Sequence, residues 1–281
     1  MGRVDRFEIV QVLATTPARR RYKIARSDRA PPRAPTAMKP TLTQLQSLLL
    51  CCYNIESRFT ELAKAASAAE PPAPRLLDVI DAVAVGPSKI DGLGLHASRD
   101  LEPGTLVTLY PVHAMGDEEH CLTFDESGHF ENAMTCPYRV GCTHEAFKEA
   151  KVWVDANPDR PRSDGWLGHM VNDAAIVDSG EDEMIEEYYD QAKANVVLVP
   201  LSVAPLMAWV TRCAVPRGAE CLGTYGHDYW LSRGGREVPA FTPRVIAAAS
   251  GWKADQRRAR EEVSRRYENE LALLGALMEV E

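Results

Sequence analysis

The stretch that decides the fold reads Gly218-Ala219-Glu220-Cys221-Leu222-Gly223-Thr224-Tyr225-Gly226-His227-Asp228-Tyr229-Trp230. It places Tyr225 between a short, partly apolar segment and a glycine. Taken alone, such a tyrosine is more often a core residue than a functional one, because aromatic side chains carry much of a protein's buried area. What Tyr225 does therefore depends on the segments that precede it.

The first of these segments reads Lys89-Ile90-Asp91-Gly92-Leu93-Gly94-Leu95-His96-Ala97-Ser98-Arg99-Asp100-Leu101-Glu102-Pro103-Gly104, and an apolar strand is predicted from Leu106 to Tyr110. A lone Gly-x-Gly is usually a hairpin or turn, because glycine adopts positive φ easily. A dinucleotide-binding fingerprint would need a third glycine that opens a helix. Pro103 and Gly104 break any such helix, so a turn or a close approach to a ligand remains.

Three further segments follow in order. Alternation in Val152-Trp153-Val154-Asp155-Ala156 predicts a strand. The next segment reads Gly165-Trp166-Leu167-Gly168-His169-Met170-Val171-Asn172-Asp173. The apolar region from Asn195 to Val210 is cut by Pro200 and Pro205, which predicts two buried strands joined by bends.

Four of these segments, in this order, resemble the motifs of SET-domain protein lysine methyltransferases over roughly residues 81–230. The first resembles that family's Gly-x-Gly-apolar-x-Ala-x-Arg-Asp, and the last resembles its Gly-x-Glu-apolar-x-x-Tyr-Gly. The segment ending at Asp173 lies where the family has Gly-Asn-x-Ala-Arg-Phe-x-Asn-His. The resemblance implies a mainly β fold with flanking helices, in which small sheets surround a knot-like active site, plus N- and C-terminal helices.

The resemblance also implies a site that binds S-adenosylmethionine and a lysine side chain. Tyr225 would hold the methyl group and the amine, and Tyr110 would be a channel wall or a neighbour of the cofactor. His169 and Asp173 stand where the family has arginine and histidine, and Asn195 is the candidate for its second asparagine. The cofactor-binding residues implied are Gly92, Leu93, Gly94, His169, Asn172, Asp173 and Tyr225.

The activity that the resemblance implies is transfer of methyl groups to a lysine of a protein, with a histone as one candidate. The departures at His169 and Asp173 keep an alternative open, a catalytically weak SET-like scaffold that binds a peptide or a protein partner. In the family, the residue two positions before the catalytic tyrosine influences how many methyl groups are added. Gly223 stands there, which predicts room for di- or trimethylation.

Charge favours a basic peptide as the partner. The net charge is −8, and an acidic run extends from Asp178 to Asp190. Proteins that bind duplex nucleic acid usually show a basic footprint instead. No apolar stretch reaches the roughly 18 residues of a membrane span. We therefore expect no direct duplex ligand and no membrane segment, although a charge run is more often simply a solvated surface.

Seven cysteines without a secretory signal indicate a reducing compartment, so we expect an intracellular protein of the nucleus or cytoplasm. Their irregular spacing predicts no metal site, because zinc ligands usually come in close pairs. Hydrolase chemistry on a cysteine lacks a recognisable nucleophile turn. No cysteine follows Cys221, so the segment from Leu231 onward would have to close the lysine channel. The candidates weighed for zinc or hydrolase chemistry are Cys121, His129, Cys136, Cys142 and His144.

The 281 residues divide into four predicted parts. Residues 1–40 form a flexible extension rich in arginine and proline, and residues 41–70 form an amphipathic helix with a capping box at Thr41 and Gln44. Residues 78–235 form the SET domain, with inserts at about 115–150 and 176–192. Residues 236–281 form a C-terminal helical segment, with one long helix from about Trp252 to Met278. The apolar stripes of the two helices predict packing within the chain or, as the alternative to a monomer, a helix-mediated dimer.

Overall fold

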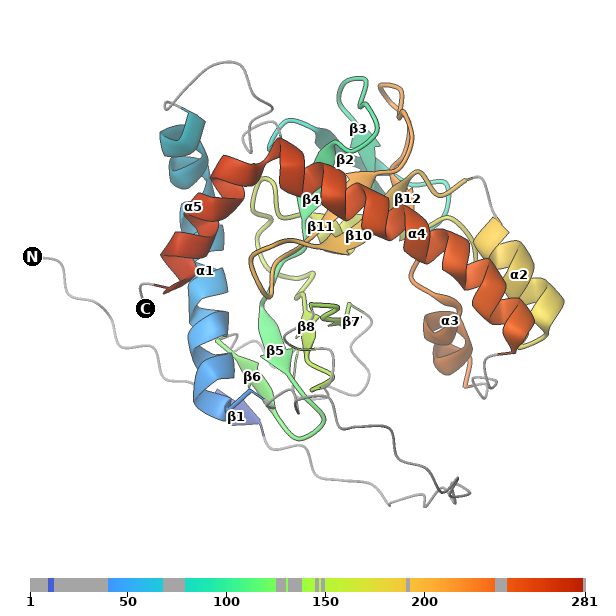
Figure 1. Cartoon of the computed structure of the whole chain (residues 1–281), viewed down its shortest axis with the longest axis horizontal. Helices are drawn as coiled ribbons and strands as arrows, with labels where there is room; N and C mark the ends of the chain where they lie inside the picture. The colour runs from blue at the N-terminus through green and yellow to red at the C-terminus, as the bar shows by residue number, and fades with distance from the viewer. Residues whose placement is uncertain are drawn as a thin grey trace, which may run out of the picture. The chain divides into compact units, whose positions relative to one another are not determined.

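The computed structural model describes residues 10–12, 40–67, 79–124, 130, 138–144, 147, 150–190, 193–235 and 242–279. The chain divides into two compact units, Met1–Leu50 with Val112–Asn157, and Cys51–Pro111 with Pro158–Glu281. The described strands form four small sheets and helices flank them, as the predicted mainly β fold requires (Figure 1). Apart from residues 10–12 and 40, the predicted extension lies outside the described residues.

The first unit contains one antiparallel sheet in the order β1-β6-β5-β8-β7. The strand predicted from alternation is present as β8 (Trp153–Asp155), between β5 and β7 in this sheet. Gly116 has no room for a Cβ atom there, because the His120 backbone carbonyl and the Trp153 ring fill the space. The other strands are β1 (Val10–Val12), β5 (Ala114–Gly116), β6 (Cys121–Thr123) and β7 (Val140–Gly141).

The second unit contains three sheets. β2 (Val83–Pro87) and β3 (Leu93–Ala97) form an antiparallel hairpin around the predicted turn. A three-stranded antiparallel sheet has the order β10-β11-β4, and β9 pairs in parallel with β12. The predicted strands are therefore confirmed as β4 (Leu106–Leu109), β10 (Val196–Pro200) and β11 (Met207–Thr211), and the short pair is β9 (Asn172–Asp173) and β12 (Leu222–Gly223).

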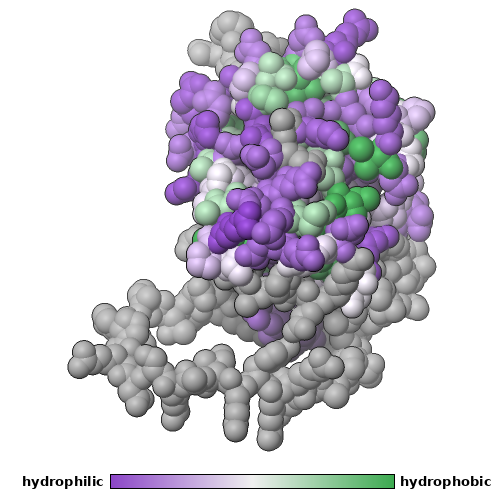
Figure 2. Space-filling model, turned by 90° about the vertical axis from the view of Figure 1, so that its right-hand side faces the viewer, coloured by the Kyte–Doolittle hydropathy of each residue, from purple (hydrophilic) through white to green (hydrophobic). Residues whose placement is uncertain are grey.

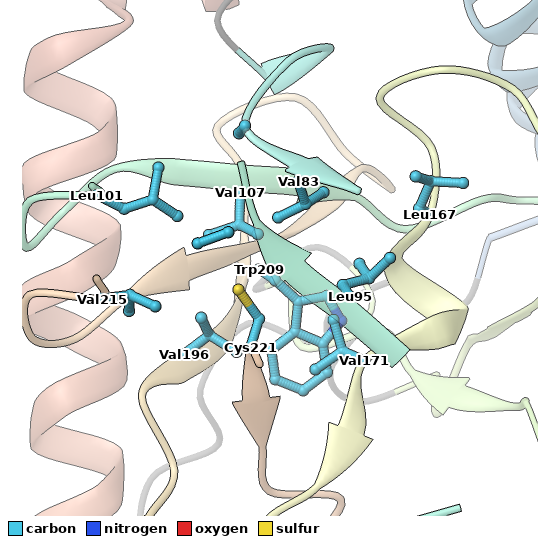
Figure 3. Packing of buried hydrophobic residues seen from close by; sticks show 12 residues of the cluster. Val83, Leu95, Leu101, Val107, Leu167, Val171, Val196, Trp209, Val215 and Cys221 are labelled. Carbon is cyan, nitrogen blue, oxygen red and sulfur yellow. The ribbon is translucent and has the colours of Figure 1, made fainter. Parts of the chain in front are cut away.

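One hydrophobic core joins the three sheets of this unit (Figure 3). Leu95 from β3, Val171 before β9, Trp209 from β11 and Cys221 before β12 all lie in it. The indole N–H of Trp209 donates to the carbonyl of Gly168 at 2.8 Å, so its polar atom is satisfied inside the core. The core thus fixes the segments that carry the predicted site residues relative to one another.

Helix α1 (Leu42–Ser67) begins with the predicted capping box. The Gln44 N–H donates to Thr41 Oγ1 at 3.2 Å, and the Thr41 N–H donates to Gln44 Oε1 at 2.8 Å. The ring of Phe59 packs edge-on against Trp166, with 5.7 Å between ring centroids. The predicted apolar stripe is buried at Leu45, Leu49, Cys52, Ile55 and Phe59, while the side chain of Leu62 lies outside the described residues.

The predicted long C-terminal helix is instead two helices, α4 (Pro243–Arg266) and α5 (Glu268–Glu279), interrupted at Tyr267. Tyr267 is buried, and its hydroxyl accepts a hydrogen bond from the Leu106 N–H at 3.4 Å. The first helix also begins earlier than predicted, because Thr242 is its N-cap and Pro243 follows at the first helical position. The predicted stripe is buried at Val263, Tyr267, Leu271 and Leu274, and the Met278 side chain lies outside the described residues.

The predicted acidic insert contains helix α2 (Asp182–Asp190), which packs along α4 (Figure 1). Its apolar face joins α3 (His227–Arg233) in a second small core of Val177, Ile185, Tyr188, Leu231 and Val245. Arg244 of α4 pairs with Glu183 and Glu186 at 2.5 and 2.6 Å. Figure 2 shows a face that is mostly hydrophilic, with apolar residues in small separate patches. None of the helices in the described ranges combines the length and apolarity needed to cross a bilayer.

Candidate functional site

The hairpin turn between β2 and β3 is held by Ser88. Its Oγ accepts from the N–H groups of Ile90 and Asp91 at 2.9 and 3.4 Å, and its own N–H donates to the Gly92 carbonyl at 3.0 Å. Gly92 has φ +49°, a conformation that favours glycine. The first glycine of the pair is thus a turn residue, as its sequence context predicts.

Asn172 connects this hairpin to the rest of the site. Its amide Nδ2 lies 3.2 Å from the Asp91 carbonyl, 3.1 Å from the Leu93 carbonyl and 3.2 Å from Glu220 Oε1. A Cβ atom at Gly94 would collide with the Glu220 carboxylate as it is placed here, so a larger residue would displace that side chain. The structure therefore brings together Gly92, Leu93, Gly94 and Asn172, and it engages the amide hydrogens of Asn172 in contacts within the chain.

The segment leading to Tyr225 lies between three earlier parts of the chain. The Cys221 N–H donates to the Leu95 carbonyl at 2.7 Å on β3, and Leu222 pairs in parallel with Asn172. Asn195 closes the third side: its Oδ1 accepts from the Leu222 N–H at 2.9 Å, and its Nδ2 donates to the Glu220 carbonyl at 2.8 Å. This enclosure agrees with the knot-like arrangement predicted for the site.

Tyr225 follows directly and is fixed at both ends. Its N–H donates to Asp173 Oδ2 at 2.9 Å, and its hydroxyl donates to the Val171 carbonyl at 2.6 Å. The residue is nevertheless 37% exposed. It is therefore a surface-accessible tyrosine rather than a core one, and a ligand can reach it.

Two aromatic side chains of α3 surround Tyr225. The Trp230 ring is stacked on it with 6.1 Å between centroids, and the Tyr229 ring is edge-on at 5.0 Å. Arg233 lies over the Tyr229 ring, with Cζ 5.8 Å from the centroid. Aromatic faces attract cations, so this cluster is suited to contact a positively charged group.

Asp173 is a buried carboxylate, 2% exposed, at the centre of these contacts. Its Oδ2 accepts from the Tyr188 hydroxyl at 2.6 Å, the Tyr225 N–H at 2.9 Å and the Trp230 indole N–H at 2.8 Å. Its Oδ1 accepts from the Ala175 N–H at 3.2 Å. Burial raises the pKa of this carboxyl group above its usual value, while these four hydrogen bonds act in the opposite direction.

A second polar contact, not anticipated from the sequence, lies next to the cluster. The Tyr189 hydroxyl is 2.9 Å from His227 Nδ1, and His227 Nε2 is 3.0 Å from the Asp228 carboxylate. The hydrogen bond from His227 lowers the pKa of Asp228, and burial raises the pKa of Tyr189 to about 12. This chain of contacts ties α2 to the start of α3.

Tyr110 follows strand β4, and His169 lies in the short 3₁₀ turn Gly168–Met170 before β9. Tyr110 is buried, and its N–H donates to the Met207 carbonyl at 2.9 Å. Gly168, which precedes His169 in a short 3₁₀ turn, lies so close to Tyr110 that a Cβ atom there would meet the tyrosine backbone at 2.9 Å. Their roles as channel wall and cofactor contact remain predictions.

The expected open space beside Gly223 is filled. A Cβ atom at Gly223 would collide with the Trp209 ring, which is buried at 2% exposure. The expectation of room for repeated methylation held only if no other aromatic side chain, such as Tyr110 or Tyr229, took this space. Trp209 of β11 takes it, and no local pattern around Gly223 indicates that neighbour.

Three buried cysteines of the described ranges do not resemble nucleophiles. Burial raises the pKa of Cys121 and Cys142 to about 11 and that of Cys221 to about 12. Cys136 and His129 lie outside the described residues. Among the described residues, no cluster of three or more histidine, cysteine, aspartate or glutamate side chains could hold a metal ion.

Sequence reasoning missed three residues of this site, namely Tyr188, Trp209 and Trp230, whose contacts to it are given above. Trp230 stands in the quoted stretch, five residues after Tyr225, and could have been considered as its neighbour. Tyr188 lies in an acidic run and Trp209 in an apolar strand, and neither context carries a functional signal.

Comparison with known proteins adds little to this geometry. No protein-family model matches the chain, and a search of curated proteins finds no match. Among solved structures, a Plasmodium falciparum protein described as a "putative histone methyltransferase" is 13% identical. The alignment covers 53% of this chain and 97% of the other, with a TM-score of 0.32. At this TM-score the match carries no argument about function, and the inferences below rest on this chain's own residues.

Proposed function

We propose that this protein transfers methyl groups from S-adenosylmethionine to a lysine side chain of a protein. The observation that carries the proposal is the convergence of the separated motifs. Asn172 contacts both the Gly92–Gly94 loop and Glu220, and Tyr225 follows the strand that pairs with Asn172. Residues far apart in sequence thus meet at strand β9, and the exposed Tyr225 is held by Val171 and Asp173 of the same segment, in the order that the family resemblance implies.

The residues around this tyrosine suit the cofactor's charge. When bound, S-adenosylmethionine supplies an electrophilic methyl group on a positively charged sulfur. The Glu220 carboxylate and the aromatic cluster around Tyr225 both favour cations. The open space around Gly92, where a Cβ atom would meet nothing within 4 Å, leaves its backbone accessible to a ligand. We therefore assign the cofactor to Gly92, Leu93, Gly94, His169, Asn172, Asp173 and Tyr225.

The main task of the chain is to present a neutral, oriented amine. A free lysine has a pKa of about 10.4, so deprotonation at pH 7 costs about 4 to 5 kcal/mol. Apolar surroundings reduce that cost because they disfavour the ammonium form. Tyr225 orients the amine through its hydroxyl and ring, and Tyr110 forms a wall of the lysine channel. Orientation alone accounts for large rate effects when reactants are held in line.

The substrate class follows from charge. Acidic side chains at Asp178, Glu181, Glu187 and Asp190 are exposed on and beside α2, which packs against the α3 helix that follows Tyr225. Their long-range field attracts a lysine- and arginine-rich peptide. We propose a basic protein, such as a histone, as substrate, met in the nucleus or cytoplasm by a monomer or a helix-mediated dimer. The segment from Leu231 onward closes the channel.

A second candidate is a SET-like scaffold that binds a partner with little turnover. The observation that favours it is the state of Asn172, whose amide hydrogens are directed at two backbone carbonyls and Glu220 rather than at open space. In that case Asn172 acts as a structural cross-link, and only its Oδ1 atom is left to accept from a ligand.

Two measurements separate the candidates. Calorimetry should detect S-adenosylmethionine binding to the wild-type chain. Mass spectrometry should detect methyl-lysine on a basic peptide that has been incubated with the chain and S-adenosylmethionine. Tyr189→Phe serves as a control variant, because Tyr189 lies on α2 and contacts His227 rather than Asp173 or Tyr225. Cofactor binding without transfer to any basic protein tested would favour the scaffold, and absence of binding would refute the proposed activity.

A further inference from the structure

We propose that Asp173 and Tyr188 act together as positioning residues that fix the peptide groups on both sides of Tyr225. The inference rests on the proposed function, in which Tyr225 orients the reacting groups. It gives Asp173 a positioning role in addition to the cofactor contact proposed above. Helix α2, part of the predicted insert, contributes Tyr188 to the site.

The first peptide group is held directly. The N–H of Tyr225 donates to Asp173 Oδ2 at 2.9 Å. Because the acceptor is a buried carboxylate, this hydrogen bond is stronger than one between neutral groups. It fixes the chain immediately before the Cα atom of Tyr225.

The second peptide group is held through Tyr188. The N–H of Gly226 donates to the Tyr188 hydroxyl at 3.0 Å, and that hydroxyl donates to the same Asp173 Oδ2 at 2.6 Å. Tyr188 therefore accepts from the backbone and donates to the carboxylate at the same time. The chain immediately after the Cα atom of Tyr225 is fixed by this relay.

The same oxygen also orients the neighbouring ring. The Trp230 indole N–H donates to Asp173 Oδ2 at 2.8 Å, and the Trp230 ring is stacked on Tyr225 with 15° between the ring planes. One carboxylate oxygen thus sets two peptide groups and one stacked ring around a single tyrosine.

Tyr225 needs such support because of where it lies. It is exposed on the segment between β12 and α3, and the next residue, Gly226, has φ +98°, which only glycine adopts without strain. Glycine does not restrict the backbone by itself. The restriction has to come from the two hydrogen bonds, and Tyr188 can supply one because α2 buries it at 4% exposure.

The test compares two neighbouring tyrosines of α2. Tyr188→Phe removes only the relay hydroxyl, and Tyr189→Phe removes a hydroxyl that contacts His227 instead. With S-adenosylmethionine and a basic peptide, we expect Tyr188→Phe to lower kcat about tenfold with both KM values unchanged, because misplacement of a reacting group affects the chemical step. Tyr189→Phe should keep the wild-type kcat.

Hydrogen exchange gives a readout that does not depend on methyl transfer. The Gly226 amide should exchange at least about tenfold faster in Tyr188→Phe and at the wild-type rate in Tyr189→Phe, since only the first loses its acceptor. If the wild-type chain transfers no methyl group, the proposed function fails but this comparison still tests the positioning contacts. Unchanged Gly226 exchange in Tyr188→Phe would overturn the inference, as would a raised KM with an unchanged kcat.

Asp173→Asn provides an independent variant. It keeps one oxygen acceptor and removes the charge, so we expect a loss of kcat larger than that of Tyr188→Phe, on the order of 100-fold. The Tyr225 and Gly226 amides should both lose protection. An Asp173→Asn protein that folds and turns over at the wild-type rate would also overturn the inference.

Discussion

Two halves of the candidate site are organised by two consecutive residues of the same short strand. Asn172 holds the Gly92–Gly94 hairpin, and Asp173 holds the aromatic half, which consists of Tyr188, Tyr225 and Trp230. Successive residues of a strand point to opposite faces. Strand β9 can therefore serve both halves with only two side chains.

The halves differ in the chemistry that holds them. The hairpin half uses a neutral amide that donates to backbone carbonyls. The aromatic half uses a buried carboxylate that accepts four hydrogen bonds, at a position where the family has histidine. A departure from a motif, such as Asp173, can therefore replace one set of hydrogen bonds by another and leave the site intact.

The largest expected effect tests whether the aromatic half contains the reactive residue. Tyr225→Phe should reduce methyl transfer on the order of 100-fold, because the hydroxyl that orients the amine is lost. Folding and cofactor binding should be preserved, apart from about 1 kcal/mol for the lost hydrogen bond to Val171. Single-turnover assays with calorimetry would measure both, and transfer at the wild-type rate would remove Tyr225 from the reaction.

A second change tests the hairpin half. Asn172→Ala should lower the free energy of unfolding by about 1 kcal/mol, because exposed and partly buried polar groups lose their hydrogen bonds to its amide. We also expect S-adenosylmethionine to bind at least several-fold more weakly. Urea unfolding and calorimetry would measure these effects, and unchanged affinity would show that Asn172 is only a structural cross-link.

The independence of the two halves can be measured with the same variant. Combining Asn172→Ala with Trp230→Phe should give stability losses that add within about 0.5 kcal/mol, as expected for sites without shared partners. A larger interaction energy would show that β9 couples the two halves, and the halves would then not be independent.

A third change tests the packing of Gly223, on the strand beside β9, against Trp209. Gly223→Ala should destabilise the fold by roughly 1 to 3 kcal/mol, because the added methyl group would overpack against the Trp209 ring. Trp209→Phe in the same chain should recover part of this loss by making room. If Gly223→Ala is as stable as the wild type in urea, the ring does not fill that space in solution.

The last comparison concerns pH. Burial raises the pKa of Cys221 to about 12, whereas an unfolded chain has a thiol pKa of about 8.5. Between these values the unfolded state releases the proton and the folded state keeps it, so stability falls as pH rises, by up to about 1.4 kcal/mol per pH unit. Unfolding measured from pH 8 to 11 should show a shallower decline in Cys221→Ala. Equal slopes would mean that the thiol is not protected.

Local patterns predicted much of the fold. Alternation identified β8, prolines marked the ends of the segments that became β10 and β11, and Thr41 with Gln44 predicted the start of α1. These features depend on neighbours within a few residues. The break at Tyr267 was not predicted, because that residue continues the apolar spacing of a helix. Its hydroxyl accepts a hydrogen bond from the Leu106 N–H, a contact with a residue far away in the sequence.

By itself, the sequence determined that Gly92, Asn172 and Tyr225 belong to ordered motifs and that Gly94 and Gly223 lack side chains. Only the tertiary structure decided what surrounds them: Glu220 beside Gly94, Trp209 beside Gly223, and Tyr188 and Trp230 on the Asp173 carboxylate. The physical reason is that backbone conformation follows largely from local sterics and hydrogen bonding, whereas the partner of a buried polar group or the filler of a gap comes from strands and helices far along the chain.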